Sequence, residues 1–198
     1  MNIVFDLGMV LIEWDPRHLY RKVFADEAKM EWFLENVCNS AWNLEQDRGR
    51  DWKDAIREAV NRHPDHAREI QLYRERWMEM VPGAIAGSVK ILEDLHAANV
   101  PLYAITNWNG ETFQETRARF SFLNHFHDII VSGDEKILKP DSAIFELLCV
   151  RNNLRANECL FIDDSLKNVH GAEACGWKGH HFTSPDGLRK ALVDLQVL

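Results

Sequence analysis

Three carboxylates in this chain each stand just after a short apolar run. Asp6 follows the run 3–5, and Asp163 and Asp164 follow the run 160–162. If these runs are strands of one parallel sheet, their carboxyl ends meet at one edge, which is where ligands bind in such sheets. Three carboxylates that close together repel one another by several kcal/mol per pair unless some are protonated or a cation lies among them. All-oxygen ligands with room for water suit Mg²⁺ better than zinc or copper.

Two more side chains at the same edge would complete a site for a phosphoryl group. Thr106 ends the apolar run 102–105, and Lys139 stands past a further run, directly before Pro140. A divalent ion, an ammonium group and a hydroxyl group together stabilise the charge on a transferred phosphoryl group. Asp6, aimed at the phosphorus, would be a nucleophile that forms an aspartyl-phosphate. Each residue alone also fits a turn, a helix start or a solvated loop, so the prediction depends on their occurrence together.

The elements that position these residues are predicted to be alternating strands and helices. The strand-like runs are Ile3–Phe5, Leu102–Ile105, Ile129–Val131, Leu160–Ile162 and, more weakly, His181–Phe182. Helical patterns cover 111–120, 141–150 and 165–175, and another runs from about Ala84 to Asn99. Short apolar strands that alternate with helices indicate an α/β fold with a doubly wound parallel sheet, a Rossmann-like core. Asp141 and Ser165 are expected as N-caps, and Gly176 is expected just after a helix C-terminus.

One region interrupts this alternation. Residues 15–80 show helical periodicity rich in Trp, Arg and Glu, without a strand-like run, and Pro82 and Gly83 follow it. We interpret 15–80, hereafter the cap segment, as an inserted α-helical cap domain. The Rossmann-like core is then predicted to consist of residues 1–14 and 81–198.

Composition narrows the possible partners. The 198-residue chain has a formal net charge of −8 and a sequence pI near 5.6, which argues against nucleic-acid or anionic-membrane partners. No secretory signal pattern and no apolar run of about 18 residues is present. The four cysteines show no CxxC spacing. These features favour a cytoplasmic protein with thiols that pack as small hydrophobes, and a monomer or homodimer is expected.

The segments FDLGMVL, AITNW, LKPD and FIDDS together resemble the four motifs of the haloacid dehalogenase-like hydrolase superfamily. The inserted helical segment resembles the capped subfamily that includes bacterial sugar-phosphate phosphatases. The resemblance implies that Asp6 is the nucleophile and also ligates Mg²⁺, and that Gly8 offers its backbone carbonyl to the metal. It further implies that Asp163 ligates the metal directly, and that Asp164 ligates it through water or holds the ligands in place.

The same resemblance implies how a small phosphorylated metabolite, for example a sugar phosphate, would bind. Thr106 would donate its hydroxyl to the phosphoryl oxygens, with Asn107 nearby. Lys139 would pair with Asp6 and the phosphate. Trp108, directly after the second motif, is expected to border the substrate pocket.

Gly8 departs from the family pattern. Phosphatases of the superfamily usually carry Asp at this position as general acid and then general base, and such help contributes roughly 10²–10⁴ in rate. Either a nearby acid replaces it, with Asp15 or Glu13 as candidates, or the substrate has a leaving group that needs little protonation. Asp15 precedes Pro16, and it fits a helix N-cap equally well.

Two alternatives to a Mg²⁺-dependent phosphatase stay open. A dehalogenase also lacks the acid at position 8, but it uses no metal, and an uncompensated Asp163-Asp164 pair would raise the pKa of its Asp6 nucleophile. A weakly active binding or regulatory homologue would keep the pocket without the acid. Within the cap segment, Arg48 in the stretch 45–49 is expected to reach the substrate, although a solvent-exposed turn fits that stretch as well.

Overall fold

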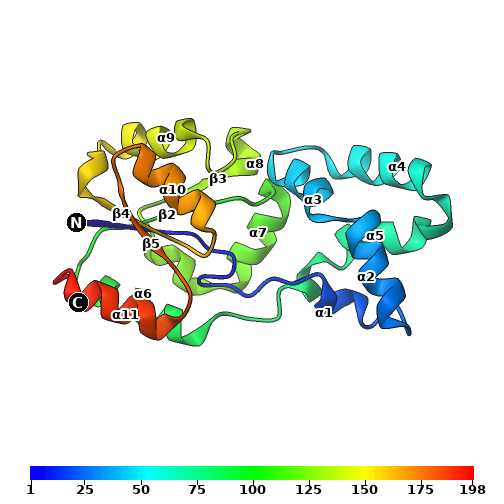
Figure 1. Ribbon diagram of the computed structural model, residues 1–198, viewed down its shortest axis with the longest axis horizontal. Coiled ribbons are helices and arrows are strands. Elements are labelled where there is room, and N and C mark those ends of the chain that lie inside the picture. Colours follow the sequence, from blue (N-terminus) through cyan, green and yellow to red (C-terminus); the bar gives the residue numbers. More distant parts are fainter.

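A five-stranded, fully parallel sheet lies at the centre of the computed structural model, which describes residues 1–198. The strand order is β3-β2-β1-β4-β5, and every neighbouring pair is parallel (Figure 1). The strands are β1 (Asn2–Phe5), β2 (Leu102–Thr106), β3 (Asp128–Val131), β4 (Cys159–Asp163) and β5 (Lys178–His181). The predicted doubly wound parallel sheet is confirmed.

The fifth strand is the one whose predicted bounds were wrong. It begins at Lys178 and ends at His181, one residue before Phe182. Its sequence, KGHH, has no buried residue because β5 lies at the edge of the sheet and pairs only with β4. Apolar character therefore marked the residue that follows the strand, not the strand itself.

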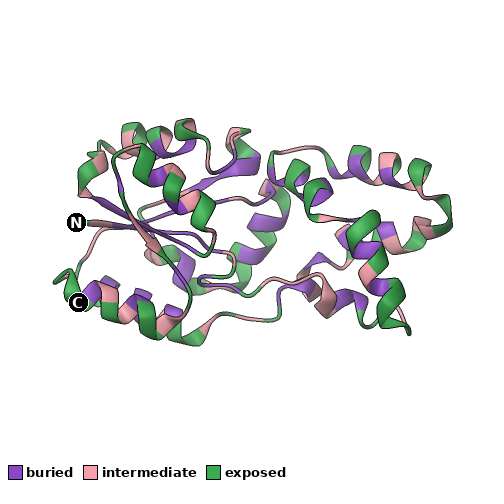
Figure 2. Cartoon of the chain, viewed as in Figure 1, coloured by how far each residue is buried: buried purple, intermediate pink, exposed green.

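Helices cover both faces of the sheet, as Figure 1 shows. The helices α9 (Ser142–Asn152) and α10 (Leu166–Ala174) pack on one face, and α6 (Ala86–Ala97) and α11 (Pro185–Asp194) pack on the other. Side chains alternate between the faces along each strand. Val4 belongs to the apolar cluster with α9, whereas Ile3 and Phe5 belong to the cluster with α6 and α11. Figure 2 shows the central strands as buried and the outer faces of the helices as exposed.

The predicted caps hold in two of three cases. Asp141 caps α9 by accepting a hydrogen bond from the Ala143 N–H at 3.0 Å. Gly176, with φ +82°, follows α10 in the left-handed conformation that favours glycine. Ser165 does precede α10, but its side chain makes no capping hydrogen bond.

The remaining core helices lie near the carboxyl ends of the strands. They are α7 (Gly110–Arg119), which follows β2, and α8 (Ser132–Glu135), which follows β3 directly. Short 3₁₀ turns complete the secondary structure at Pro64–His66, Trp77–Met80, Ser121–His125 and Ala156–Glu158.

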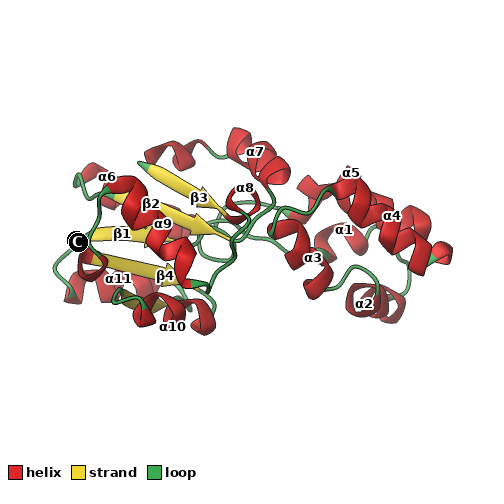
Figure 3. Cartoon of the chain, turned by 90° about the horizontal axis from the view of Figure 1, so that it is seen from above, coloured by secondary structure: helices red, strands yellow, loops and turns green.

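The cap segment forms a separate group of helices, α1 (Arg17–Tyr20), α2 (Glu27–Asn36), α3 (Ser40–Asp47), α4 (Trp52–Arg62) and α5 (Ala67–Glu75). In Figure 3 the arrowheads of the strands point toward this group. Tyr73 is at its aromatic centre, with ring centroids 5.1 Å from Trp42 and 5.8 Å from Trp77. The helical character of 15–80 is thus observed, and its assignment as a separate cap domain stays a prediction.

The two connections between the cap segment and the sheet run side by side. The Glu13 N–H donates to the Gly83 carbonyl at 3.0 Å, and the Ile85 N–H donates to the Leu11 carbonyl at 2.9 Å. The chain therefore enters and leaves the cap segment as a short antiparallel pair. No helix in the structure is both long enough and apolar enough to cross a membrane. The four cysteines are free thiols.

Candidate active site

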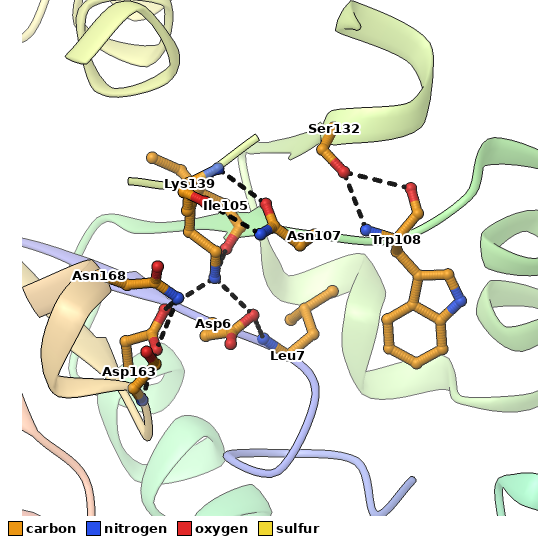
Figure 4. Close-up of polar contacts among 10 residues, drawn as sticks. Asp6, Leu7, Ile105, Asn107, Trp108, Ser132, Lys139, Asp163 and Asn168 are labelled. Carbon is orange, nitrogen blue, oxygen red and sulfur yellow. Dashed lines mark hydrogen bonds and ion pairs between the residues drawn. The ribbon is translucent and has the colours of Figure 1, made fainter. Parts of the chain in front are cut away.

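A buried lysine joins two carboxylates at the carboxyl edge of the sheet (Figure 4). The Lys139 Nζ lies 2.9 Å from Asp6 Oδ1 and 2.7 Å from Asp163 Oδ2, and it donates to the Ile105 carbonyl at 3.0 Å. The Lys139 side chain is 1% exposed, and that of Asp163 is fully buried. Because Asp6 directly follows β1 and Asp163 ends β4, the adjacent strands bring the two carboxylates together, as the sequence predicted.

The loop that carries Lys139 is held by Asn107. The Asn107 side-chain amide donates to the Lys139 carbonyl at 3.2 Å, and its oxygen accepts from the Lys139 N–H at 2.8 Å. Both ends of the Asn107 amide are therefore engaged with the protein backbone, although the residue also borders a cavity. Thr106, directly before it, is buried at the end of β2, which is where the sequence placed it.

The adjacent residues Asp163 and Asp164 lie at the end of β4. Asp163 accepts a hydrogen bond from the Ser165 N–H at 2.7 Å and from Asn168 Nδ2 at 3.1 Å. Asp164 is exposed, and its carboxylate lies close enough to those of Asp6 and Asp163 for one oxygen of each to fall within 4.8 Å of the others. The sequence analysis missed Asn168, and its signal was a polar side chain in the first turn of the helix that follows the acidic pair.

The electrostatics of this cluster follow from burial and crowding. The pKa of Asp6 is raised to about 7, chiefly by burial, with the Lys139 ammonium opposing the rise and the Asp163 carboxylate adding to it. Burial also raises the pKa of Asp164, with the charge of Asp163 adding to the effect. Burial lowers the pKa of Lys139, but the two adjoining carboxylates outweigh it and raise that pKa above its ordinary value.

The single positive charge of Lys139 does not neutralise the three carboxylates of Asp6, Asp163 and Asp164. A set of three carboxylate oxygens within 4.8 Å of one another, of which two belong to buried groups, matches what a hard divalent cation such as Mg²⁺ prefers. The residues present therefore fit the cation that the sequence predicted.

The turn after β1 carries Gly8. The Leu7 N–H donates to Asp6 Oδ1 at 2.7 Å, which fixes that carboxylate oxygen from the backbone side. Met9 has a φ of +56° and leaves its side chain 44% exposed. Gly8 borders a cavity of about 140 Å³, which is lined by Gly8, Met9, Trp14, Asn43, Asp47, Trp77, Asn107 and Trp108.

Trp108 and Asp15 occupy different cavities. Trp108 is buried and lines the cavity beside Gly8, as expected from its place in the sequence. Asp15 instead lines a neighbouring cavity of about 630 Å³. Its carboxylate accepts from the Arg17 N–H at 2.9 Å, so it acts locally as a helix-start residue. Glu13 borders neither cavity, and its carboxylate lies 3.5 Å from His18.

Arg48 lies outside both cavities, and only residues 48 and 49 of the stretch 45–49 form the expected turn. Helix α3 continues through Asp47, and Arg48 is half-exposed beside Glu45 at 3.7 Å. The neighbouring Asp47 is buried and faces the cavity instead. The sequence analysis missed Asp47. A usable signal was the polar set Asn43, Gln46 and Asp47, which share one face of a helix at i, i+3 and i+4 spacing.

A doubly wound parallel sheet with a carboxylate–lysine cluster at its carboxyl edge is a Rossmann-like α/β fold with a ligand site at its strand ends. The chain belongs to the haloacid dehalogenase-like hydrolase family, whose model matches residues 2–176. The family resemblance read from the four motifs is thereby confirmed.

Two relatives whose names state an activity align along most of the chain. A sesquiterpene phosphatase, astK, of Aspergillus oryzae is 28% identical over 182 residues, which is 91% of this chain and 88% of that protein. A 5'-nucleotidase of Pseudomonas aeruginosa is 29% identical and covers 95% of this chain and 86% of its own length.

Solved structures show the same fold. An enzyme of this family from Bacteroides thetaiotaomicron, in complex with magnesium and inorganic phosphate, superimposes with a TM-score of 0.71 at 20% identity, covering 92% of this chain and 93% of that one. A dehalogenase superimposes with a TM-score of 0.67 at 21% identity, covering 90% of this chain and 82% of that one. Proteins that share this fold therefore include both an enzyme in complex with phosphate and a dehalogenase.

Proposed function

We propose that the chain is a Mg²⁺-dependent phosphatase that hydrolyses a small phosphorylated metabolite through an aspartyl-phosphate on Asp6. The observation that carries the proposal is the Lys139 bridge between Asp6 and Asp163, with Asp164 beside them. Two relatives that align along most of the chain are named as a phosphatase and a nucleotidase, which supports phosphate ester hydrolysis.

In this proposal each residue has a defined task. Asp6 attacks the phosphorus, and Lys139 neutralises both the attacking carboxylate and the phosphoryl oxygens. Thr106 donates its hydroxyl to those oxygens, with Asn107 holding the Lys139 loop in place. Residues Asp6, Asp163 and Asp164, with the Gly8 carbonyl, would hold Mg²⁺, which supplies positive charge for the phosphoryl oxygens.

The acidic cluster also favours a phosphatase over a metal-independent dehalogenase. Without a cation, burial and the neighbouring Asp163 keep the pKa of Asp6 near 7, so a substantial fraction of the nucleophile is protonated at neutral pH. In a dehalogenase without a metal, the repulsion between Asp6 and Asp163 would disfavour the charged form of the nucleophile. Lys139 alone does not remove it.

The cavity beside Gly8 supports a small substrate. Its volume is about 140 Å³, and its apolar lining residues are Met9, Trp14, Trp77 and Trp108. Indole faces pack against apolar surfaces such as the C–H face of a sugar ring, and Asn43 adds a polar side chain to the lining. We propose that residues 15–80 act as a cap that selects the substrate, and that a sugar phosphate is one candidate. The monomeric or homodimeric state and the cytoplasmic location stay predictions.

The test is a panel of phosphate esters assayed for phosphate release, with Mg²⁺ and with EDTA. The panel should contain sugar phosphates, nucleoside monophosphates and prenyl phosphates, with 2-haloacids assayed for halide release. We expect release of phosphate that requires Mg²⁺. Halide release that persists in EDTA, without phosphate release, would instead assign the chain to the dehalogenases.

Asp6→Asn tests the nucleophile, because it keeps the shape of the side chain and removes its charge. We expect this variant to lose phosphate release altogether. Asp194→Asn, an exposed carboxylate of α11 far along the chain, is the matched control and should retain full activity. Turnover of Asp6→Asn at the wild-type rate would exclude Asp6 as the nucleophile.

A further inference from the structure

Asp47 is the one ionisable side chain that lines the cavity beside Gly8. It comes from the last residue of α3 in the cap segment, whereas Gly8, Asn107 and Trp108 reach the cavity from the ends of β1 and β2. The cavity therefore lies between the helical segment and the strand ends. The Asp47 carboxyl group of the helical segment thus faces the turn at Gly8, the position where phosphatases of the family usually carry an acid.

The end of α3 is fixed to the core by backbone carbonyls of the segment Gln46–Gly49. Ser132 Oγ donates to the carbonyl of residue 47 at 2.5 Å, and Asn109 Nδ2 donates to that of residue 46 at 3.1 Å. Lys136 Nζ donates to the carbonyl of residue 49 at 2.9 Å. All three donors belong to the core segments after β2 and β3, so Asp47 is held against the same carboxyl edge of the sheet to which β1 and β4 contribute Asp6 and Asp163.

Glycine makes this close approach possible. Gly49 has a φ of +91°, and a Cβ there would collide with the Gly133 carbonyl oxygen and lie 2.7 Å from Lys136 Nζ. A Cβ on Gly133 would in turn lie 2.8 Å from both the Trp108 carbonyl oxygen and the Gly110 nitrogen. The backbone of Gly49 therefore packs directly against the backbone of Gly133, and this contact helps to fix the position of Asp47.

The carboxyl group of Asp47 is itself held in one orientation. Asn43 Nδ2 donates to Asp47 Oδ2 at 3.1 Å, and the Tyr73 hydroxyl donates to Asn43 Oδ1 at 3.1 Å. Burial raises the pKa of Asp47 to about 8, against a hydrogen bond from the Asn109 N–H that lowers it, and the charge of Asp6 raises it as well. Burial therefore favours the protonated form of this carboxyl group.

We propose that Asp47 takes the place of the acid that is missing at Gly8, as the general acid and then the general base of the proposed phosphatase reaction. This inference rests on the proposed function and adds to it the residue that handles the proton. It also predicts that the substrate is an ordinary alkyl ester, because an activated leaving group would not require an acid.

The proton transfers balance over the two half-reactions. In the first, Asp6 Oδ forms a bond to phosphorus, the bond from phosphorus to the leaving oxygen breaks, and that oxygen takes the Asp47 proton. In the second, water attacks the phosphorus of the aspartyl-phosphate and gives a proton to the Asp47 carboxylate. The bond to Asp6 breaks, inorganic phosphate leaves, and both carboxyl groups return to their starting states.

The decisive variant is Asp47→Asn, measured on two esters that differ in leaving group. An alkyl phosphate needs a proton on its leaving oxygen, whereas the nitrophenolate of p-nitrophenyl phosphate leaves without one. We expect kcat for the alkyl ester to fall by roughly 10²–10⁴, the usual contribution of a general acid, while kcat for the nitrophenyl ester stays within a few-fold. Glu45→Gln, two residues earlier on the exposed side of α3, is the matched control and should leave both rates unchanged.

Turnover of the nitrophenyl ester shows that the variant is folded and that its nucleophile works. An equal fall on both esters would assign Asp47 a structural role, and no fall on either would exclude it from proton transfer; each result overturns the inference alone. A wild-type protein that releases phosphate from no ester would overturn the proposed function together with this inference. The two failures are therefore distinguishable.

Discussion

Replacing Lys139 with Met would test whether the active-site cluster depends on a single ammonium group for its stability. The side chain is 1% exposed and lies 2.9 Å from Asp6 and 2.7 Å from Asp163. At an effective dielectric constant of about 20, each contact corresponds to a direct attraction of about 6 kcal/mol, most of which offsets the cost of burying the charges. Removal of one partner from a buried ion pair costs about 3–5 kcal/mol because the other charge stays behind. We expect Lys139→Met to lose that much free energy of unfolding in EDTA.

The assay is equilibrium unfolding in urea, followed by the fluorescence of the seven tryptophans and by far-ultraviolet circular dichroism. Lys90→Met is the matched control, because its ion pair with Asp94 has the same 2.7 Å separation but is exposed. Exposed pairs contribute about 0–1 kcal/mol, so the control should unfold almost as the wild type does. Saturating Mg²⁺ should restore part of the loss in Lys139→Met by binding the folded state. If both variants lost less than about 1 kcal/mol in EDTA, the reasoning about a buried, uncompensated cluster would be wrong.

Two further predictions concern the contact between the cap segment and the core. Gly49→Ala forces a side chain into the left-handed region, at a cost of about 1–2 kcal/mol, and against the Gly133 carbonyl. It should therefore slow alkyl phosphate hydrolysis more than nitrophenyl phosphate hydrolysis, whereas Gly83→Ala, where a Cβ meets nothing within 4 Å, should slow neither. Gly8→Asp has space for its Cβ, since the nearest atom to a Cβ there is 4.0 Å away on Trp108. Alone it should bring little gain on alkyl esters, but added to Asp47→Asn it should recover at least about tenfold in kcat, because one acid then replaces the other. Steady-state kinetics on the two esters measures both effects, and a large gain from Gly8→Asp alone would show that the wild type has no acid.

The site residues at the strand ends could be predicted from the sequence because each of them directly follows or ends a strand-like apolar run in the chain. Asp6, Thr106 and Asp163 each end an apolar run, and a parallel sheet brings such ends to one edge whatever the rest of the fold does. Lys139 could be placed at the same edge for a related reason, since it follows β3 through the short helix α8 and lies three residues before the start of α9.

Contacts between the cap segment and the core could not be predicted in the same way. Asp47 and Gly8 are far apart in the sequence, and their proximity depends on where α3 ends and how it docks. The sequence favours Arg48 as the substrate contact, because Gly49 permits a tight turn and an arginine binds hydroxyl or anionic groups. The helix instead continues through Asp47, which turns that residue inward and leaves Arg48 outside. The contact that docks α3 on the core is made by backbone carbonyls within 46–49, and a backbone carbonyl is present whatever the residue type.

The paired connections at Glu13–Gly83 and Leu11–Ile85 have a consequence for how such proteins diversify. Because the chain leaves the sheet and returns at adjacent points, an insertion of different length could replace residues 15–80 without changing the register of β1 with β2. If Asp47 supplies the proton, however, an exchanged insertion would remove the acid as well as the pocket. Chimaeras between relatives would then inherit the nucleophile from one parent and the tolerance for poor leaving groups from the other.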